Sequence, residues 1–576
     1  MALQEIKFAP GIDKQDTSVG ALGRWVESDN IRFRYGLPEK VGGWQSLLTE
    51  SLVGVTRKMH AFVDNDGNRY VAMGTDKFLI IYFEGQFFDI TPLKTPLAAS
   101  TIATTSGSPI CSITTGTNHG LAIGDIVLLN SVTLPGGTGY VTADFDDKLF
   151  QVTSITSTTV FTITQSTNAT GTVTTGGSIS VIPYEQVGPA AQTYGYGWGV
   201  GSWGGVAWGE AVSASDVTLE PGLWSLSNFG EVLVATIANG KTFTWNSGIA
   251  ARLTTRASTG TASFSTSNNP TATRDTLISP TTRHLIHFGT ETTIGDPTTQ
   301  DDMFIRFSVN EQINVYDVLA TNTAGTFRLQ DGTTIMGAIK AKENILVWTD
   351  NALYTMKFVG APFTFGFEQV GTNCGLIGKN AAIEIDGVAY WMSNNGFFSF
   401  DGTVNTLPCS VEDYVYDDFD TTKGQQVNAG INNLYTEVTW WYPTQGSEFN
   451  NRYVVFNYGQ NNAQVPMGNW YTGTNSNSIR TTWVDSLVYP QPYATAYNSS
   501  ATGNFPVVVG EAGLGQSVFF EQEVGTDQVN PDGSTTTLTS FVESFDFALQ
   551  TDQGIGEYFL AMRRFLPNFK NLLGDV

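Results

Sequence analysis

The sequence has few cysteines, few histidines and no long hydrophobic run. Its three cysteines, Cys111, Cys374 and Cys409, are far apart and form no CxxC pair. This favours free, buried thiols in a protein that assembles in a reducing compartment. No stretch approaches the roughly 18 apolar residues of a membrane-spanning helix. The N-terminus also lacks the basic and apolar regions of a secretory signal. We therefore expect assembly in the cytoplasm, without a membrane span.

Recognisable catalytic and cofactor motifs are missing too. Only four histidines occur, and there is no HExxH motif, P-loop or Ser–His–Asp spacing. Gly199, Gly201 and Gly204 satisfy GxGxxG, but no preceding strand or following helix of a dinucleotide site is predicted around them. Asp64–Gly67 resembles the start of a calcium loop without its final glutamate, so it is interpreted as a turn. We expect no enzymatic activity, no cofactor and no metal site.

Positive charge is scarce. Acidic residues number 53 against 29 basic ones, so the net charge is −24 and most of the surface should repel nucleic acid. One local exception is the N-terminal segment, where Arg24, Arg32, Arg34 and Lys40 alternate with aromatic and apolar residues. Such interleaving can mark nucleic-acid binding. The alternative is a strand whose arginines pair with acids of neighbouring strands. We also predict these four residues as subunit or adaptor contacts.

What the sequence does contain is a repeated hairpin pattern. Each copy has an apolar run, a polar turn and a second, aromatic run, as in residues 345–360 and 388–402. Asn, Asp and Gly tolerate the positive φ angles of tight hairpin turns. β-Branched and aromatic side chains suit a half-buried sheet. Both stretches are therefore predicted to be β-hairpins.

The same pattern recurs along the chain. Further copies start at Tyr70, Val232, Leu285, Tyr453 and Val507. Repeats of about 40–50 residues with several strands each are typical of β-propeller blades. We predict an all-β fold, a β-propeller with six or seven blades. The alternative is an ordinary series of hairpins in a β-sandwich.

Residues 96–186 interrupt this pattern. Thr, Ser and Gly dominate there, charges are sparse, and apolar and hydroxyl residues alternate with period two. We predict an inserted small β-sandwich or barrel that projects outward. The predicted domains are an N-terminal strap with the first blade (1–95), the insert (96–186), the remaining blades (187–545) and a C-terminal segment (546–576).

Residues 408–423 are the best helix candidate. Ser410 and Asp413 resemble a capping box. The segment is densely acidic and carries Glu412, Asp413, Asp417, Asp418 and Asp420. Paired carboxylates could serve a glycosidase, but a solvated acidic face is the more common outcome. These five residues are our candidates for an acidic channel wall.

Two long stretches resemble a known family. FAPGIDKQDTSVGALGRWVESDNIRFRYGLPEKVGGW, residues 8–44, and the block from LVWTDNALYTMKFVG to PCSVEDYVYDDF, residues 346–419, are similar to virion proteins of short-tailed bacteriophages. These are the tail nozzle, or packaged-DNA stabilisation, proteins. Shorter stretches, among them MRRFLPNF at 562–569, fit the same pattern. The likeness covers most of the chain outside residues 96–186.

This resemblance implies a structural virion protein. Its subunits would form a homo-oligomer, a six-fold ring below the portal and adaptor, which retains packaged DNA and conducts it during ejection. Implied partners are the adaptor, tail fibres or spikes, and passing double-stranded DNA without sequence specificity. Duplex DNA carries one charge per ~1.7 Å, so a basic bore would grip it through counterion release. An acidic bore lets it slide.

Two other classes of function are open at this point. The first is a tail-associated glycan-degrading enzyme, which needs a cleft with converging carboxylates and aromatic sugar platforms. The second is a carbohydrate- or fibre-binding module centred on the insert. A depolymerase assay distinguishes the enzyme from the two binding or structural alternatives.

Overall fold

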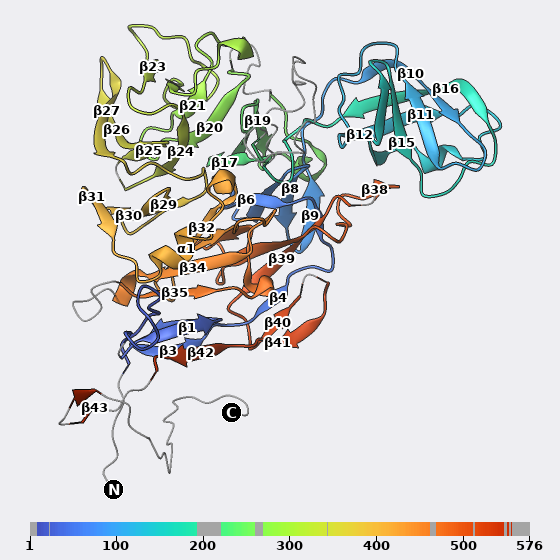
Figure 1. The fold of residues 1–576 in the computed structure, drawn as a ribbon. Helices are drawn as coiled ribbons and strands as arrows, with labels where there is room; N and C mark the ends of the chain where they lie inside the picture. Colours follow the sequence, from blue (N-terminus) through green and yellow to red (C-terminus); the bar gives the residue numbers. More distant parts are fainter. Residues whose placement is uncertain are drawn as a thin grey trace, which may run out of the picture.

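The computed structural model describes ten ranges of the chain. They are residues 8–21, 23–192, 220–259, 269–342, 344–460, 468–510, 513–530, 532–546, 550–551 and 554–555. The glycines at 199, 201 and 204 and the stretch 562–569 lie outside these ranges. Within them the protein is nearly all β, as predicted, and Figure 1 shows its two parts, a large propeller and a smaller projecting domain.

Six regular blades each contain three or four consecutive antiparallel strands. The first is β6 (Thr56–Val63), β7 (Arg69–Thr75), β8 (Leu79–Phe83) and β9 (Gln86–Asp89); the second is β17 (Trp224–Phe229), β18 (Val232–Ile237) and β19 (Thr242–Asn246); the third is β20 (Thr273–Ile278), β21 (Leu285–Thr290), β22 (Phe304–Phe307) and β23 (Gly325–Arg328). The fourth is β24 (Ile335–Lys340), β25 (Ile345–Thr349), β26 (Ala352–Gly360) and β27 (Thr364–Thr372); the fifth is β28 (Ala382–Ile385), β29 (Val388–Ser393), β30 (Gly396–Phe400) and β31 (Val404–Leu407); the sixth is β32 (Asn428–Asn432), β33 (Glu437–Tyr442), β34 (Arg452–Asn457) and β35 (Trp470–Gly473).

A larger sheet of seven strands, here called the closing sheet, completes the ring. It contains β36 (Thr482–Val484), β37 (Tyr493–Asn498), β39 (Gln516–Gln522), β4 (Trp44–Ser46), β5 (Leu52–Val53), β40 (Asp527–Val529) and β41 (Thr535–Thr537). Its innermost strand β36 packs against β32 of the sixth blade and β6 of the first. β39 pairs antiparallel with both β4 and β5. Strands from the two ends of the chain therefore close the propeller, and the prediction of six or seven blades is confirmed.

The N-terminal segment continues as a strap along the propeller. β1 (Trp25–Asp29) pairs with β42 (Phe541–Ser544), and β2 (Ile31–Arg34) pairs with β3 (Leu37–Lys40). A last described pair, β43 (Gln550–Thr551) and β44 (Gly554–Ile555), follows. Figure 1 shows β1, β3 and β42 together at one end of the molecule. The strap thus brings β1, the first described strand, beside β42 near the other end of the chain.

Tryptophans join neighbouring blades in the core. The indole of Trp224 in the second blade donates to the Thr75 carbonyl of the first at 2.9 Å. Trp440 in the sixth blade does the same to Ala381, just before the fifth, at 3.0 Å. These indoles are fully buried, so each gains apolar burial and satisfies its only donor. The aromatic runs of the sequence pattern thus supply contacts between blades.

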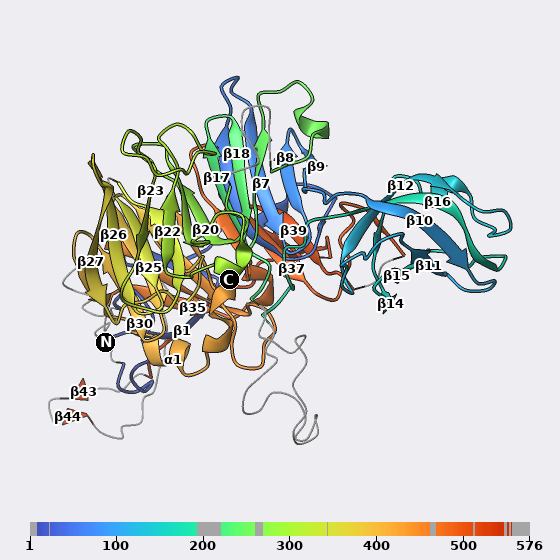
Figure 2. The same cartoon turned by 90° about the horizontal axis from the view of Figure 1, so that it is seen from above.

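The insert forms its own sheet. Its strands are β10 (Leu97–Thr104), β11 (Ile110–Thr114), β12 (Ile126–Thr133), β13 (Lys148–Gln151), β14 (Ser154–Ser157), β15 (Val160–Thr164) and β16 (Val173–Pro183), with a short 3-10 turn η1 (Thr142–Asp144). The sheet curls like half a barrel, so that β13 comes back close to β15. Figures 1 and 2 both show it projecting from the side of the propeller.

The insert is nevertheless attached to the propeller by shared packing. Ile126 and Leu149 of the insert belong to one apolar cluster with Phe78 and Phe87 of the first blade. β38 (Val508–Val509), from the loop between β37 and β39, pairs in parallel with β13. The domain projects outward, but its base is part of the propeller's core.

Helices are few and short. The chain has one α-helix, α1 (Glu412–Tyr416), within the described ranges, and the 3-10 helices η3 (Arg252–Thr254), η5 (Pro297–Thr299), η6 (Thr421–Gln426), η7 (Tyr458–Gln460) and η8 (Ser476–Ser478). The helix predicted over 408–423 is therefore only partly correct. The predicted capping box is wrong, because the Ser410 hydroxyl donates to the Ile12 carbonyl instead. Across the described ranges, no helix is long and apolar enough to cross a membrane.

Most predicted hairpins are confirmed. The copies starting at Tyr70, Val232 and Leu285, and those at 345–360 and 388–402, pair as the second and third strands of five blades. The copy at Tyr453 is the last hairpin of the sixth blade. The copy at Val507 is wrong, because β38 pairs with the insert rather than with β39.

Candidate interaction surfaces

The strap arginine Arg32 is buried between two glutamates of other elements. Its Nε lies 3.2 Å from Glu437 Oε1, and its guanidinium makes a bidentate pair with Glu523. The ring of Tyr435 covers the guanidinium at 3.4 Å. Burial raises the pKa of Glu437 to about 7, against the opposing effect of Arg32. The side chain of Tyr471 donates a hydrogen bond to Glu437. Arg32 thus attaches the strap to Glu437 and Glu523 inside the protein.

The other basic residues of the strap lie closer to the surface. Arg24 is 3.7 Å from Asp13, and burial lowers its pKa. Arg34 is half-buried and lies 4.0 Å from Glu39, while Lys40 is exposed. For all three arginines the structure therefore shows the alternative interpretation, pairing with acids of neighbouring elements. Contact with another subunit or an adaptor stays a prediction that only the accessible Arg34 and Lys40 can serve directly.

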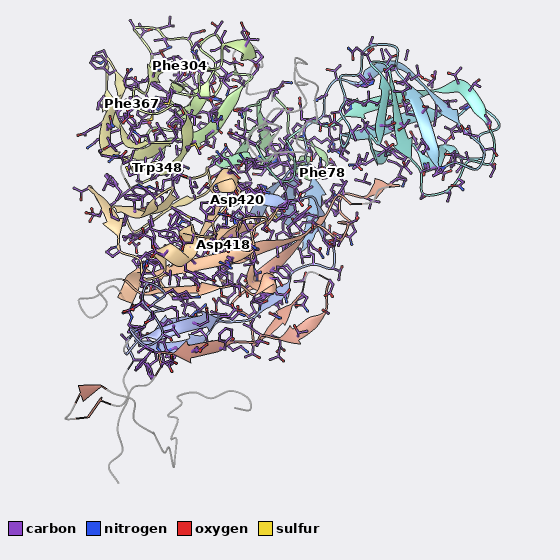
Figure 3. The ribbon with its side chains drawn as sticks, viewed as in Figure 1. Phe78, Phe304, Trp348, Phe367, Asp418 and Asp420 are labelled. Carbon is purple, nitrogen blue, oxygen red and sulfur yellow. The ribbon has the colours of Figure 1, made fainter. Side chains whose placement is uncertain are left out.

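The acidic segment connects the fifth and sixth blades. Two of its acids are paired inside the chain: Asp418 with Arg452 at 2.8 Å and Asp420 with Lys423 at 3.2 Å. Figure 3 labels Asp418 and Asp420 on this connection. A third acid of the segment, Asp413, is exposed.

The remaining two acids differ in exposure. Asp417 is exposed, like Asp413, whereas Glu412 is half-buried and burial raises its pKa. The apolar face of the segment packs into the core through Val415 and Phe419. The accessible part of this candidate wall is therefore Asp413 and Asp417. Within the described ranges, no group of three or more His, Cys, Asp or Glu side chains could hold a metal ion.

The axis of the propeller is bridged by side chains. Lys58 Nζ in the first blade donates to Asn380 Oδ1, next to the fifth blade, at 3.0 Å. Lys379 Nζ lies 3.2 Å from Asp275 in the third blade. Arg57 donates to Gln426, next to the sixth blade, at 2.8 Å. None of these pairs joins neighbouring blades, so these side chains of the described residues extend into the centre of the ring and narrow it.

An aromatic cleft opens at the outer edge of the third and fourth blades. The β26–β27 hairpin is longer than the strands beside it and lies against β22 and β23. Phe327 of β23 and Phe367 of β27 stack with ring centroids 4.1 Å apart and planes 4° from parallel. The cleft has a volume of about 320 Å³. It is lined mainly by Phe307, Phe327, Val359, Phe363, Phe365 and Phe367.

Several large apolar side chains in and beside the cleft are accessible. Phe363, at the tip of the hairpin, is 76% exposed, and Phe358 and Val359 are exposed as well. Figure 3 labels Phe367 and Phe304 in this part of the molecule. Contiguous exposed apolar patches on a protein surface often mark interaction sites, whereas single exposed apolar residues are ordinary. Thr326 is the one hydroxyl-bearing residue of the lining, so the cleft suits apolar groups better than sugars.

Sequence reasoning did not identify either the cleft or the bridged axis. The signal for the cleft was the dense aromatic stretch KFVGAPFTFGF at 357–367, where five large apolar residues surround a turn. Two of the three axial contacts join residues more than 300 positions apart, and no local pattern predicts such pairs.

Comparison with known proteins gives only weak likenesses. No family model matches the chain, and no curated protein matches it. Among solved structures, the computationally designed Ika8 protein aligns over 83% of this chain and 99% of its own, with 9% identity and a TM-score of 0.34. A phage phi92 endosialidase aligns over 91% and 71%, with 10% identity and a TM-score of 0.19. AztD from Citrobacter koseri aligns over 64% and 93%, with 8% identity and a TM-score of 0.23.

Proposed function

We propose that the protein is a structural subunit of a bacteriophage tail, a tail nozzle protein that forms a ring below the portal and adaptor. In this proposal the ring retains packaged DNA and conducts it during ejection. The observation that carries the proposal is the resemblance of residues 8–44 and 346–419 to that family. The described residues of both stretches belong to one propeller, where they form the strap and parts of the fourth and fifth blades.

The contacts between non-neighbouring blades support a ring of several subunits. Side chains of the described residues narrow the centre of the propeller, so we place the DNA in a wider channel that several copies enclose. The net charge of −24 suits the wall of such a channel, because phosphate contacts would otherwise slow the DNA. Exposed acids such as Asp413 and Asp417 are candidates for that wall.

The aromatic cleft supports assembly with another protein surface. It lies on the outer edge of the blades, where a neighbouring subunit can reach it. A ring needs two different complementary surfaces on each subunit, because its contacts are head-to-tail. We propose the cleft as one of them.

The test is the oligomeric state of the purified full-length protein and of tails that contain it. Native mass measurement should show several copies in cyclic symmetry, and six is the expected number. Phe363→Ser should reduce ring formation, because an apolar contact is lost. Leu434→Ser is the matched control, since Leu434 is 64% exposed and lies outside the cleft.

Two outcomes would overturn the proposal. One is a single copy of the chain in intact tails. The other is cleavage of host polysaccharide by the purified protein that is lost in Asp417→Asn, which would favour the glycan-degrading alternative. If rings form equally well from Phe363→Ser and the control, the ring stands and the cleft is not its contact surface.

A further inference from the structure

A polar cleft lies where the insert joins the propeller. Two chain segments run between these parts, and they pair with each other. The Lys94 amide donates to the Pro183 carbonyl at 2.8 Å, and the Glu185 amide donates to the Pro92 carbonyl at 3.0 Å. Beside this paired backbone is a cavity of about 430 Å³, here called the junction cleft. Ligand pockets commonly have this size and often form between domains.

Three parts of the molecule line the junction cleft. They are the two junction segments, with residues between 92 and 97 and between 183 and 185; His119 of the insert; and residues 241, 243 and 257–259 of the second blade and the loop after it. The Ala257 amide in that loop donates to the Ile90 carbonyl of the first blade at 2.8 Å. Backbone hydrogen bonds thus hold two of the three walls of the cleft.

One lysine of the lining is available to a ligand. Lys241 already pairs with Glu185 at 3.1 Å. Lys94 is half-buried and forms no ion pair within the described ranges. Burial raises the pKa of the Asp125 carboxyl in the insert, and the charge of Lys94 opposes this effect. That carboxylate accepts the Ala122 amide at 2.8 Å, however, and lies outside the lining. The Lys94 amine can therefore serve an anionic group in the cleft.

His119 has a structural role in this lining. Its Nδ1 accepts the Leu121 amide at 2.9 Å, which leaves Nε2 to donate to the Ser157 carbonyl at 2.9 Å. An imidazole that accepts at one nitrogen and donates at the other is neutral. His119 thus fixes the edge of the insert at the cleft and has no free nitrogen for acid–base chemistry.

The rest of the lining combines hydroxyls with apolar surface. Thr95 and Thr259 carry hydroxyls, which can both donate and accept hydrogen bonds. Pro92, Pro183 and Phe243 are buried apolar residues of the same lining. A sugar ring presents hydroxyls at its edge and C–H groups on its faces, so it complements both kinds of surface. A carboxylate on that ring would add a charge-assisted hydrogen bond with an ammonium group.

The charged groups of the cleft suit binding rather than cleavage. Glycoside hydrolysis generally needs two carboxyl groups about 5–9.5 Å apart on either side of the scissile bond. Among the described lining residues Glu185 is the one carboxylate, and its partner is Lys241. The cleft therefore has the groups that recognise an acidic sugar and lacks, in this lining, the acid pair that would hydrolyse it.

We propose that the junction cleft binds a carboxylate-bearing sugar, such as a uronic acid unit of an acidic polysaccharide. The carboxylate pairs with Lys94, and the ring hydroxyls contact Thr95, Thr259 and the ion pair of Lys241 with Glu185. The proposal does not depend on the tail function proposed above. It places carbohydrate binding where the insert meets the second blade, not on the insert alone.

The binding test uses the full-length protein and D-glucuronate at constant ionic strength. Saturation-transfer NMR should show saturable binding by the wild type. Lys94→Met should weaken binding roughly tenfold, because a hydrogen bond to a charged group is lost. Lys241→Met should weaken it too, since the freed charge of Glu185 repels the ligand; Lys241 is 47% exposed, so this variant should fold even if Lys94→Met does not. Lys148→Met, at an exposed position elsewhere on the insert, is the control and should bind normally.

Two further probes separate the parts of the ligand. Glucose carries the hydroxyls without the carboxylate, and acetate carries the carboxylate without the ring. Each should bind at least roughly tenfold more weakly than glucuronate, because each loses one set of contacts. Equal binding of glucose would show that charge has no role. Equal binding of acetate would show that the sugar ring has none. Either result overturns the proposal.

A second readout locates the site. His119 lines the cleft, whereas the other three histidines of the chain lie outside its lining. Glucuronate should therefore shift the imidazole NMR signal of His119, assigned by His119→Gln, and leave the other three unchanged. The proposal is overturned if glucuronate does not bind saturably or if it binds without shifting the His119 signal. It is equally overturned if Lys94→Met and Lys241→Met both bind as tightly as Lys148→Met.

Discussion

Arg32 and Glu523 form a buried, bidentate ion pair between the start and the end of the propeller. Nη1 of Arg32 donates to Oε2 of Glu523 at 3.2 Å, and Nη2 donates to the other carboxylate oxygen. Both side chains are less than one-tenth exposed. Glu437 lies on the same guanidinium, so one cation serves two carboxylates. This one side chain thus joins the strap to both the closing sheet and the sixth blade.

Arg32→Ala should strongly destabilise the protein. It leaves two buried carboxylates without their cation, and removing one partner of a buried pair costs about 3–5 kcal/mol. The free energy of unfolding in urea measures this loss. Arg34→Ala is the control: Arg34 is half-buried and its pair with Glu39 is long, so we expect a change of about 0.5 kcal/mol or less. Equal effects of the two variants would contradict the prediction.

Glu437→Gln should change how stability depends on pH. Burial raises the pKa of Glu437 to about 7 in the folded protein, above its ordinary value of about 4.3. Such a group stabilises the fold fully below the unfolded pKa, and this contribution is lost as the pH rises through the folded pKa. The free energy of unfolding of the wild type, minus that of the variant, should therefore decline between about pH 5 and pH 7.5. Urea unfolding at several pH values measures it, and a pH-independent difference would show that Glu437 is ionised throughout.

Removal of the insert should leave a folded but less stable propeller if Tyr184 is kept. A deletion that joins Thr95 to Pro183 through a short Gly/Ser linker preserves the bridge between Leu93 and Tyr184. The Tyr184 hydroxyl donates to Asp89 and accepts from Arg256, which follows the last strand of the second blade. The shortened chain exposes Phe78 and its neighbours, so its midpoint of urea unfolding should fall.

The matched variant for this deletion is a longer one that joins Ala98 to Pro189 and also removes Tyr184. It should be less stable than the shorter deletion by about 2–4 kcal/mol, since a fully buried aromatic side chain and its hydrogen bonds are lost. Circular dichroism during unfolding distinguishes the two. Insolubility of the shorter deletion would mean that the insert is an integral part of the core.

Replacing exposed acids with lysines should give the protein an affinity for duplex DNA. Asp413 and Asp417 are the accessible members of the acidic segment, and changing both to Lys creates a local basic patch. Binding measured at several salt concentrations should weaken as salt rises. Ejection from particles with this variant should be slower. The control changes Glu50 and Asp532, both exposed, to Lys. If the control slows ejection equally, the acidic segment has no special position in the channel.

The sequence predicts the hairpins well because the information is local. In residues 345–360 the apolar run, the turn and the second run are adjacent, so tight-turn chemistry sets the register directly. The insert is predictable for a similar reason, since its alternating composition differs from the rest. The hairpin at Val507 fails because the partner of β38 is β13 of the insert, more than 350 residues earlier.

The candidate sites are less predictable than the fold. The sequence shows that Arg32 stands among aromatic residues of the basic strap. The burial of Arg32, however, depends on Glu437 and Glu523, which come near it only in the folded ring. The aromatic cleft likewise depends on two blades meeting at Phe327 and Phe367. Long-range pairings of this kind leave no periodic trace in one sequence.

The shared closing sheet also makes completion of the ring a late event in synthesis. Trp44 pairs with Gln522, so a ribosome adding ~5–20 residues per second needs roughly 25–100 s between the two partners. Throughout that interval Leu52 and Val53, which are fully buried in the finished protein, lack the β39 strand that pairs with them. Uncovered apolar residues and unpaired strand edges are what chaperones bind and what aggregates form from. A nascent chain interrupted before β39 is therefore left as an open arc of blades. A chain that extends beyond β39 can pair this strand with β4 and β5 and so complete the ring.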